Sequence, residues 1–269
     1  MGKAKDIVLK PISPKTARAF VRRVHYSGKV AQNSQLHFGV YLNNRLEGAL
    51  QFGPSLDKRK IQGLVSGSGW HEFIELNRMA FTDALPRNSE SRAIAIAFRL
   101  LRKHAPQIKW CVSFADATQC GDGTIYRASG FVLTGIKDNN QIIRLEDGRV
   151  VHKMSLEQIQ FGTQAEKTPF RDAPEFMGIT KGAYSLDRYL KAKGVSYESL
   201  PGFQLRYIYF IDPAYRARLT VPEIPFSEIE KRGASMYKGE KITRPLDGKN
   251  ITTSDARRFD SDPDALKTI

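Results

Sequence analysis

One stretch decides the fold class of this chain: Ser113-Phe-Ala-Asp-Ala-Thr-Gln-Cys-Gly-Asp-Gly-Thr-Ile-Tyr-Arg-Ala-Ser-Gly-Phe131. The apolar residues 110–115 predict a buried strand that ends at a carboxylate, Asp116. A polar, glycine-rich loop follows, and then a short helix that contains Ile125 and Tyr126 and ends at Gly130. Because α/β enzymes place their chemistry where a buried strand ends before a helix, Asp116 is the first candidate catalytic residue.

The residues on either side predict an α/β (α+β) fold. Strands are expected at 6–10, 36–42, 46–52, 73–81, 131–136, 141–145, 150–154 and 205–211. Ser13-Pro14 begins one helix, and a second runs from Asn88 or Ser89 to a stop at Pro106. The order β-α-β-β-β-α-β-α-β, together with Tyr126-x-x-x-Gly-Phe131, resembles the GNAT acyltransferase superfamily, which implies a mixed central sheet flanked by helices and splayed around a donor site.

Four regions are expected along the chain. Residues 1–160 form the GNAT-like catalytic core, and residues 161–202 form a helical insertion. Residues 203–230 add a strand that returns to the main sheet and a proline-rich extension. Residues 231–269 are basic and poor in aliphatic side chains, which predicts a flexible tail.

Composition points to a cytoplasmic protein that binds a polyanion. The 269 residues carry a formal net charge of +14, which favours nucleic acid over a merely basic, soluble protein. No apolar run approaches the roughly 18 residues of a membrane-spanning helix, and the N-terminus lacks the apolar core of a signal peptide. With only Cys111 and Cys120, a disulfide framework or a cysteine zinc site is not expected.

The GNAT resemblance fails at the segment that binds coenzyme A. GNAT proteins carry a glycine-rich motif before the helix, and its backbone amides hold the pyrophosphate. Residues 85–93 of this chain read Leu-Pro-Arg-Asn-Ser-Glu-Ser-Arg-Ala and contain no glycine. The sequence therefore argues against coenzyme A as the donor.

A smaller family accounts for this departure. Five motifs resemble the Mom family of phage proteins: His25-Tyr26-Ser27-Gly28, Phe38-Gly39-Val40-Tyr41, Glu75-Leu76-Asn77-Arg78-Met79-Ala80, Asn88-Ser89-Glu90-Ser91-Arg92 and Ser113-Phe114-Ala115-Asp116. The resemblance covers roughly residues 5–160, and the strand 206–211 also fits. It implies conversion of adenine in double-stranded DNA to its carbamoylmethyl (acetamido) form on the exocyclic amine, which protects phage DNA from host restriction.

The resemblance also implies catalytic residues. It maps an iron-linked histidine–tyrosine pair onto His25 and Tyr26, and a catalytic carboxylate onto Asp116; the three could together hold a metal. Tyr126 is the counterpart of the GNAT tyrosine that protonates the leaving group. The alternatives are that His25 and Tyr26 only pack at a helix end, and that Tyr126 belongs to the core.

A second group of residues is expected to bind the donor or the base. Arg78 and Arg92 suit a phosphate or carboxyl group of the donor, although Arg78 could instead pair with Glu75 or Asp116. Ser89, Glu90 and Ser91 lie at a helix N-terminus, where anion binding and simple capping are equally open. Tyr41 and Tyr26 are candidate stacking platforms for a flipped adenine. His37, His71 and His104 are interpreted as surface or structural residues.

Three functions remain in competition. The first is adenine modification in DNA by a donor that the sequence does not identify. Glycine or an aminoacyl-tRNA would suit the missing phosphate loop and the positive charge, and a donor-carrying RNA would then be a second partner. The second is an acetyl-CoA-dependent N-acyltransferase that acts on a protein or a small amine. The third is a non-catalytic DNA-binding protein, which leaves the Asp116 loop unexplained.

Overall fold

The computed structural model describes the chain over residues 4–25, 27–117, 121–153, 190–191, 194–200, 202–232, 235–237 and 240–242. The chain forms two compact units. The first contains residues 1–115, 120–136 and 205–241, and the second contains residues 116–119, 137–204 and 242–269. The predicted core of residues 1–160 therefore extends past the first unit, which breaks at Ile136 and resumes at Leu205.

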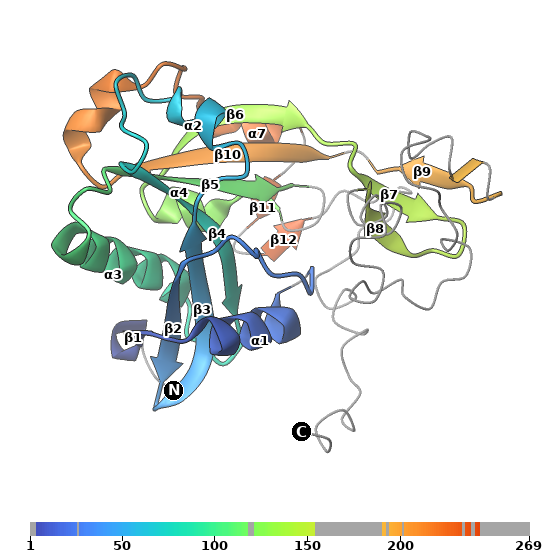
Figure 1. The fold of residues 1–269 in the computed structure, drawn as a ribbon. Coiled ribbons are helices and arrows are strands. Elements are labelled where there is room, and N and C mark those ends of the chain that lie inside the picture. Colours follow the sequence, from blue (N-terminus) through green and yellow to red (C-terminus); the bar gives the residue numbers. More distant parts are fainter. Residues whose placement is uncertain are drawn as a thin grey trace. The chain divides into compact units, whose positions relative to one another are not determined.

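The first unit is built on a seven-stranded sheet with the order β1-β2-β3-β4-β5-β10-β6 (Figure 1). The pairs β1–β2, β2–β3 and β3–β4 are antiparallel, and β4–β5 is parallel, so the sheet is mixed as predicted. The strands are β1 (Val8–Pro11), β2 (Leu36–Leu42), β3 (Arg45–Gly53), β4 (Phe73–Phe81), β5 (Trp110–Asp116), β6 (Val132–Asp138) and β10 (Phe203–Phe210). The helices are α1 (Pro14–Val24), α2 (Lys58–Gln62), α3 (Ser89–His104), α4 (Thr124–Ala128) and α7 (Ser227–Lys231), with the 3₁₀ turns η1 (Ala4–Asp6) and η4 (Pro213–Arg218).

Local sequence signals account for most of these elements. Ser13 caps α1 because its hydroxyl accepts a hydrogen bond from the Thr16 N–H (3.1 Å). Asn43 and Asn44 both adopt positive φ values, 50° and 62°, which suit the tight turn between β2 and β3. The one-turn helix α2 was not predicted.

Helices cover both faces of the sheet. Phe20 and Val21 of α1 pack with Ala49 and Ala80 on one face. On the other face the Phe98 ring of α3 lies 6.4 Å from that of Phe52. Side chains alternate along a strand, so Ala49 and Phe52 of β3 point to opposite faces. The predicted fold class, a mixed sheet flanked by helices, is confirmed.

The predicted returning strand is also confirmed. β10 lies between β5 and β6 (Figure 1). Its residues Leu205, Tyr207 and Ile208 are fully buried, as expected for a central strand.

The second unit contains a three-stranded antiparallel sheet. Its order is β8-β7-β9, from β8 (Val150–His152), β7 (Ile142–Leu145) and β9 (Tyr197–Ser199). The first two strands match the predicted strands at 141–145 and 150–154. The predicted helical insertion and tail lie mostly outside the described residues. Among the residues that are described, no helix is long and apolar enough to cross a membrane.

The turn before α4 gives a test of the packing. Gly123 has φ 72°, and a Cβ there would lie 2.6 Å from Cε2 of the buried Tyr207. We expect Gly123→Ala to lower the free energy of unfolding by about 3 kcal/mol, because backbone strain and overpacking add. Urea denaturation measures this change.

Gly130, just after α4, is the matched control. It also has positive φ (81°), but a Cβ there would lie at an ordinary 3.6 Å from the Tyr209 ring. Gly130→Ala should lower the free energy of unfolding by only about 1–2 kcal/mol, the cost of placing alanine in the left-handed backbone conformation. Equal losses in the two variants would show that the Tyr207 contact adds nothing.

Candidate functional site

The strands β4 and β5 part in the middle of the sheet. They pair only at Phe73↔Trp110, Ile74↔Cys111 and Glu75↔Val112, although both described strands continue beyond these residues. On the other side of β4, Gln51 is opposite Arg78 and the next residue, Phe52, is opposite Leu76. Asn77 is therefore an extra residue, a β-bulge, at the place where β4 leaves β5. Bulges are common beside active sites because they redirect side chains.

Ser113 bridges the two strands beyond the last pair. Its hydroxyl donates to the Leu76 carbonyl (3.0 Å) and lies 2.8 Å from the Tyr126 hydroxyl. Tyr126 is buried and also stacks on Tyr207, with 5.0 Å between ring centroids. The role of Tyr126 as proton donor to a leaving group stays a prediction.

A cluster of polar side chains surrounds the bulge; we call Ser34, Ser55, Glu75, Asn77 and Arg78 the β4 polar cluster. Burial raises the pKa of Glu75, while the neighbouring Ser55, Asn77 and Arg78 act in the opposite direction. Asn77 Oδ1 accepts a hydrogen bond from the Ser34 hydroxyl (3.0 Å). A half-buried carboxyl group with a raised pKa is a stronger base than an exposed one, which makes Glu75 a candidate general base.

Gly53 lets the chain close around this cluster. A Cβ at Gly53 would lie 2.6 Å from the Asn33 carbonyl oxygen and 2.8 Å from Asn77 Oδ1. The amide of Asn33 in turn donates to the Pro54 carbonyl (2.5 Å). The segment before β2 is thereby held against the end of β3 and the bulge, which shields Glu75 from water.

Arg78 binds main-chain carbonyls. Its guanidinium donates to the carbonyls of Lys29 (3.2 Å) and Asn77 (2.7 Å), rather than forming the ion pair considered from the sequence. Burial, and then the Arg78 charge, lower the pKa of Lys29. Opposite Arg78, the buried Gln51 lies 3.2 Å from His37 Nδ1, so His37 is a structural core residue.

His25 caps the C-terminus of α1. Its backbone N–H donates to the Val21 carbonyl (2.9 Å), and its Nδ1 accepts from the Ser27 N–H (3.2 Å). A neutral His25 ring therefore carries its proton on Nε2. Tyr26 lies outside the described residues. Asp116 belongs to the second unit, where the Asn139 amide donates to its Oδ1 (3.2 Å).

The iron implied by the family resemblance stays a prediction, because Tyr26, one of its three expected ligands, lies outside the described residues. Among them, no three His, Cys, Asp or Glu side chains lie close enough to hold a metal ion. No step proposed below passes through a metal.

The residues expected to bind the donor at the start of α3 make hydrogen bonds to backbone carbonyls of the chain itself. The backbone N–H of the buried Ser89 donates to the Pro86 carbonyl (3.1 Å), and Ser91 Oγ donates to the Asn88 carbonyl (3.2 Å). Arg92 is exposed and donates to the Lys5 carbonyl (3.3 Å). Glu90 lies in the first turn of the helix, where a carboxylate suits the dipole.

Tyr41 lies away from the bulge. It pairs with Val8 of β1 and with Leu46 of β3, and the Lys10 ammonium lies 5.5 Å from its ring centroid. This position is at the hairpin end of β2. Arg78 thus lies close to Glu75 and Asn77 in the structure, whereas Tyr41 does not.

The sequence reasoning missed Glu75, Asn77, Ser34 and Ser55 as site residues. Glu75 entered only as a possible partner for Arg78. The sequence did contain a signal: a glutamate, an asparagine and an arginine lie within four residues of an otherwise apolar strand. Burying polar groups costs free energy unless they have partners, so such a group of residues indicates a polar site.

The mixed sheet, covered by helices on both faces, and the parted strands β4 and β5 define an α/β protein. Within that class the chain belongs to the Mom protein family, whose model matches residues 6–228. It is 36% identical to the methylcarbamoylase Mom of Escherichia phage Mu over 162 residues. That match covers 60% of this chain and 66% of the phage protein.

Solved structures of acetyltransferases are more distant. The spermidine/spermine N-acetyltransferase of Vibrio cholerae is 9% identical with a TM-score of 0.38, over 80% of this chain and 98% of that one. A GNAT-family acetyltransferase of Bacillus anthracis is 10% identical with a TM-score of 0.39, over 78% of this chain and 98% of that one.

The raised pKa of Glu75 predicts a pH-dependent stability. The folded state holds this proton more tightly than the unfolded state does, so wild-type stability falls as the pH rises from 4.5 through the raised pKa. Glu75→Gln has no proton to lose. Its stability relative to wild type should therefore grow across that window and then level off.

Urea denaturation at a series of pH values measures this difference. Glu230→Gln removes the same charge from an exposed position of α7 and serves as the control. Parallel stability curves for Glu75→Gln and wild type would contradict the raised pKa.

The start of α3 predicts weak binding of coenzyme A. Residues 85–93 lack glycines, and the Ser89 N–H is already hydrogen-bonded. We expect a Kd for acetyl-CoA weaker than about 1 mM, roughly −4 kcal/mol, in isothermal titration calorimetry. Micromolar affinity would favour the acyltransferase alternative.

Proposed function

We propose that this protein transfers a carbamoylmethyl group to the exocyclic amine of adenine in DNA. Membership of the Mom family over residues 6–228 is the observation that carries this proposal. The net charge of +14 supports DNA as the partner, since a basic surface attracts the phosphate backbone. The modified base would protect phage DNA inside the host cell from restriction enzymes.

The reaction requires a base. A bond forms between the adenine nitrogen and the methylene carbon of the donor, while the donor's bond to its leaving group breaks and that group departs with the electron pair. The nitrogen must also lose a proton, because the lone pair of an aromatic amine is delocalised and the amine is weakly nucleophilic. We assign this proton to Glu75, whose raised pKa suits a general base.

The remaining candidates have supporting roles in this proposal. Arg78, on the bulged strand, orients the carbonyl oxygen of the donor. Asp116, His25 and Tyr26 are assigned to the site from the family resemblance alone. The donor in this step is a carbamoylmethyl compound that carries its leaving group on the methylene carbon. A glycyl ester of tRNA does not meet this requirement as it stands, because its leaving group is on the carbonyl carbon; the positive charge of the chain would suit an RNA carrier of the donor.

An adenine inside a duplex cannot reach an enclosed carboxyl group. The exocyclic amine lies in the major groove and is stacked and paired. The base must therefore be flipped out of the helix before transfer, as in other enzymes that act on a base.

Mass spectrometry of nucleosides from cells that express the protein tests the function. We expect a heavier deoxyadenosine in wild-type cells and a loss of at least about a hundredfold in Glu75→Gln, the effect of removing a general base. Unmodified DNA in wild-type cells would reject the proposal.

Asp116→Asn identifies the base independently. If Glu75 is the base, Asp116→Asn should retain more activity than Glu75→Gln. Full activity in Glu75→Gln, with loss in Asp116→Asn, would transfer the role to Asp116. Both variants preserve side-chain shape, and circular dichroism confirms that each is folded.

A further inference from the structure

The connection between β3 and β4 exposes apolar and basic side chains together; we call residues 54–72 the β3–β4 loop. Leu56 is 87% exposed and Trp70 is 45% exposed, and they are two of the four large hydrophobic residues exposed in the described part of the chain. Between them α2 begins with Lys58-Arg59-Lys60. A single exposed leucine is ordinary, but an apolar tip beside three cations suits a nucleic acid.

The loop is anchored firmly to the first unit. Ile61, Leu64 and Val65 are buried against Phe73 and Trp110. The Trp110 indole donates to Ser68 Oγ (2.8 Å), and Arg218 donates to the Ser66 carbonyl (2.7 Å).

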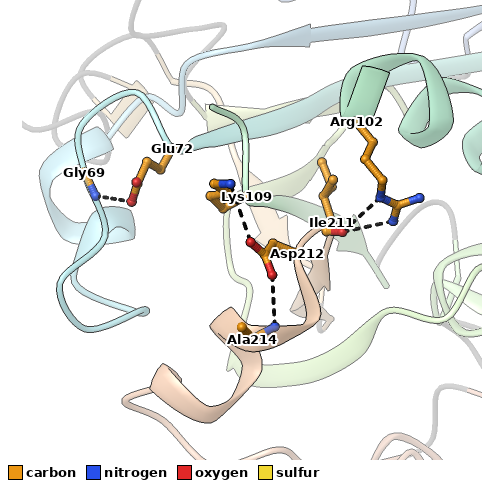
Figure 2. Close-up of polar contacts among 7 residues, drawn as sticks. All are labelled: Gly69, Glu72, Arg102, Lys109, Ile211, Asp212 and Ala214. Carbon is orange, nitrogen blue, oxygen red and sulfur yellow. Dashed lines mark hydrogen bonds and ion pairs between the residues drawn. The ribbon is translucent and has the colours of Figure 1, made fainter. Parts of the chain in front are cut away.

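Near its end the loop closes through Glu72, whose carboxylate accepts from the Gly69 N–H (2.7 Å; Figure 2). Beside it, Asp212 pairs with Lys109 (3.5 Å) and caps η4 at the Ala214 N–H (3.1 Å), which fixes the end of β10 below the loop (Figure 2). The exposed side chains therefore project from a segment that packing and hydrogen bonds anchor to the first unit.

Some charged side chains of the loop make contacts within the protein, and others are exposed to solvent. Asp57 caps α2 by accepting from the Lys60 N–H (3.3 Å). The Lys58 ammonium lies 4.6 Å from the Trp70 ring centroid and 5.4 Å from that of Phe73, so it packs on aromatic faces. Arg59 and Lys60 remain exposed and can reach phosphates.

Leu56 is adjacent in sequence to the β4 polar cluster. Ser55 is buried beside the Glu75 carboxyl group, and Leu56 follows it with Cα atoms about 3.8 Å apart. The exposed Leu56 thus directly follows Ser55, a neighbour of the candidate base Glu75.

We propose that the β3–β4 loop opens the DNA duplex: Arg59 and Lys60 contact phosphates, and Leu56 inserts into the base stack that the flipped adenine vacates. This inference rests on the proposed function, because only chemistry on a base requires flipping. Apolar wedges of this kind offset the cost of unstacking, and the adjacent Glu75 would receive the extruded adenine.

Fluorescence of 2-aminopurine tests base opening without requiring the reaction. Full-length protein is mixed with duplexes that carry 2-aminopurine at adenine positions, and a rise in fluorescence reports unstacking. We expect Leu56→Ala to lose this rise while its DNA affinity, from fluorescence anisotropy, falls by no more than about tenfold. The matched control is Val8→Ala, which truncates a residue of β1 that is 49% exposed. An undiminished rise in 2-aminopurine fluorescence with Leu56→Ala would contradict the insertion of Leu56 into the base stack.

Salt dependence tests the phosphate contacts. Replacing both Arg59 and Lys60 with Gln should reduce the slope of log affinity against log salt by about 2, since each lost phosphate contact removes about 0.9. Arg45→Gln, at the other end of β3 with a side chain 84% exposed, is the charge control and should change the slope less. An unchanged slope in the double variant would show that the loop does not contact phosphates.

A substrate with an unpaired adenine separates this inference from the proposed function. Leu56→Ala should modify duplex DNA at least about tenfold more slowly than wild type, and an unpaired adenine at the wild-type rate, because that base needs no opening. Slow transfer on both substrates would assign Leu56 another role. A Leu56-dependent fluorescence rise without any modified base would reject the function and leave the loop's role intact.

Discussion

The bulge at Asn77 is the constraint on which the candidate site depends. The extra residue in β4 ends the pairing with β5 after Glu75 and Val112, so the two strands part inside the sheet. Polar side chains can lie between parted strands without breaking a continuous ladder, and the Ser113 hydroxyl donates to the Leu76 carbonyl beyond the last pair. An acid at this position is half-buried and has a neighbour, Ser55, in a segment that leads to the surface.

Burying Glu75 costs stability, and the surrounding structure offsets part of that cost. Ser55, Asn77 and Arg78 favour the charged carboxylate, while burial disfavours it more strongly. Gly53 allows the Asn33–Ser34 backbone to approach and complete this shell, which no larger residue would permit. The neutral amide of Glu75→Gln would relieve the cost of the buried charge, so at this residue the demands of folding and of catalysis oppose each other.

Local chemistry made much of the fold predictable. Ser13-Pro14 and Asn43-Asn44 mark a helix start and a tight turn by mechanisms that operate within four residues, and apolar periodicity located β4, α3 and β5. The bulge could not be predicted, because it is a mismatch of register between two strands that are distant in sequence. Glu75 was overlooked for a similar reason: its environment includes Ser55, which comes from another segment of the chain. The helix α2 is too short for periodicity to reveal it.

The central claim is that Glu75, held at the parting of β4 and β5, removes the proton from the adenine amine. The pH dependence of kcat/KM for modification of an oligonucleotide with an unpaired adenine tests this claim most directly, since its acid limb reports the ionisation of the base in the free enzyme. We expect an acid limb centred above 4.5, the ordinary value for glutamate, at the pKa that ¹³C NMR assigns to the Glu75 carboxyl group. An acid limb at 4.5 or below, or one that does not coincide with the titration of Glu75, would contradict it.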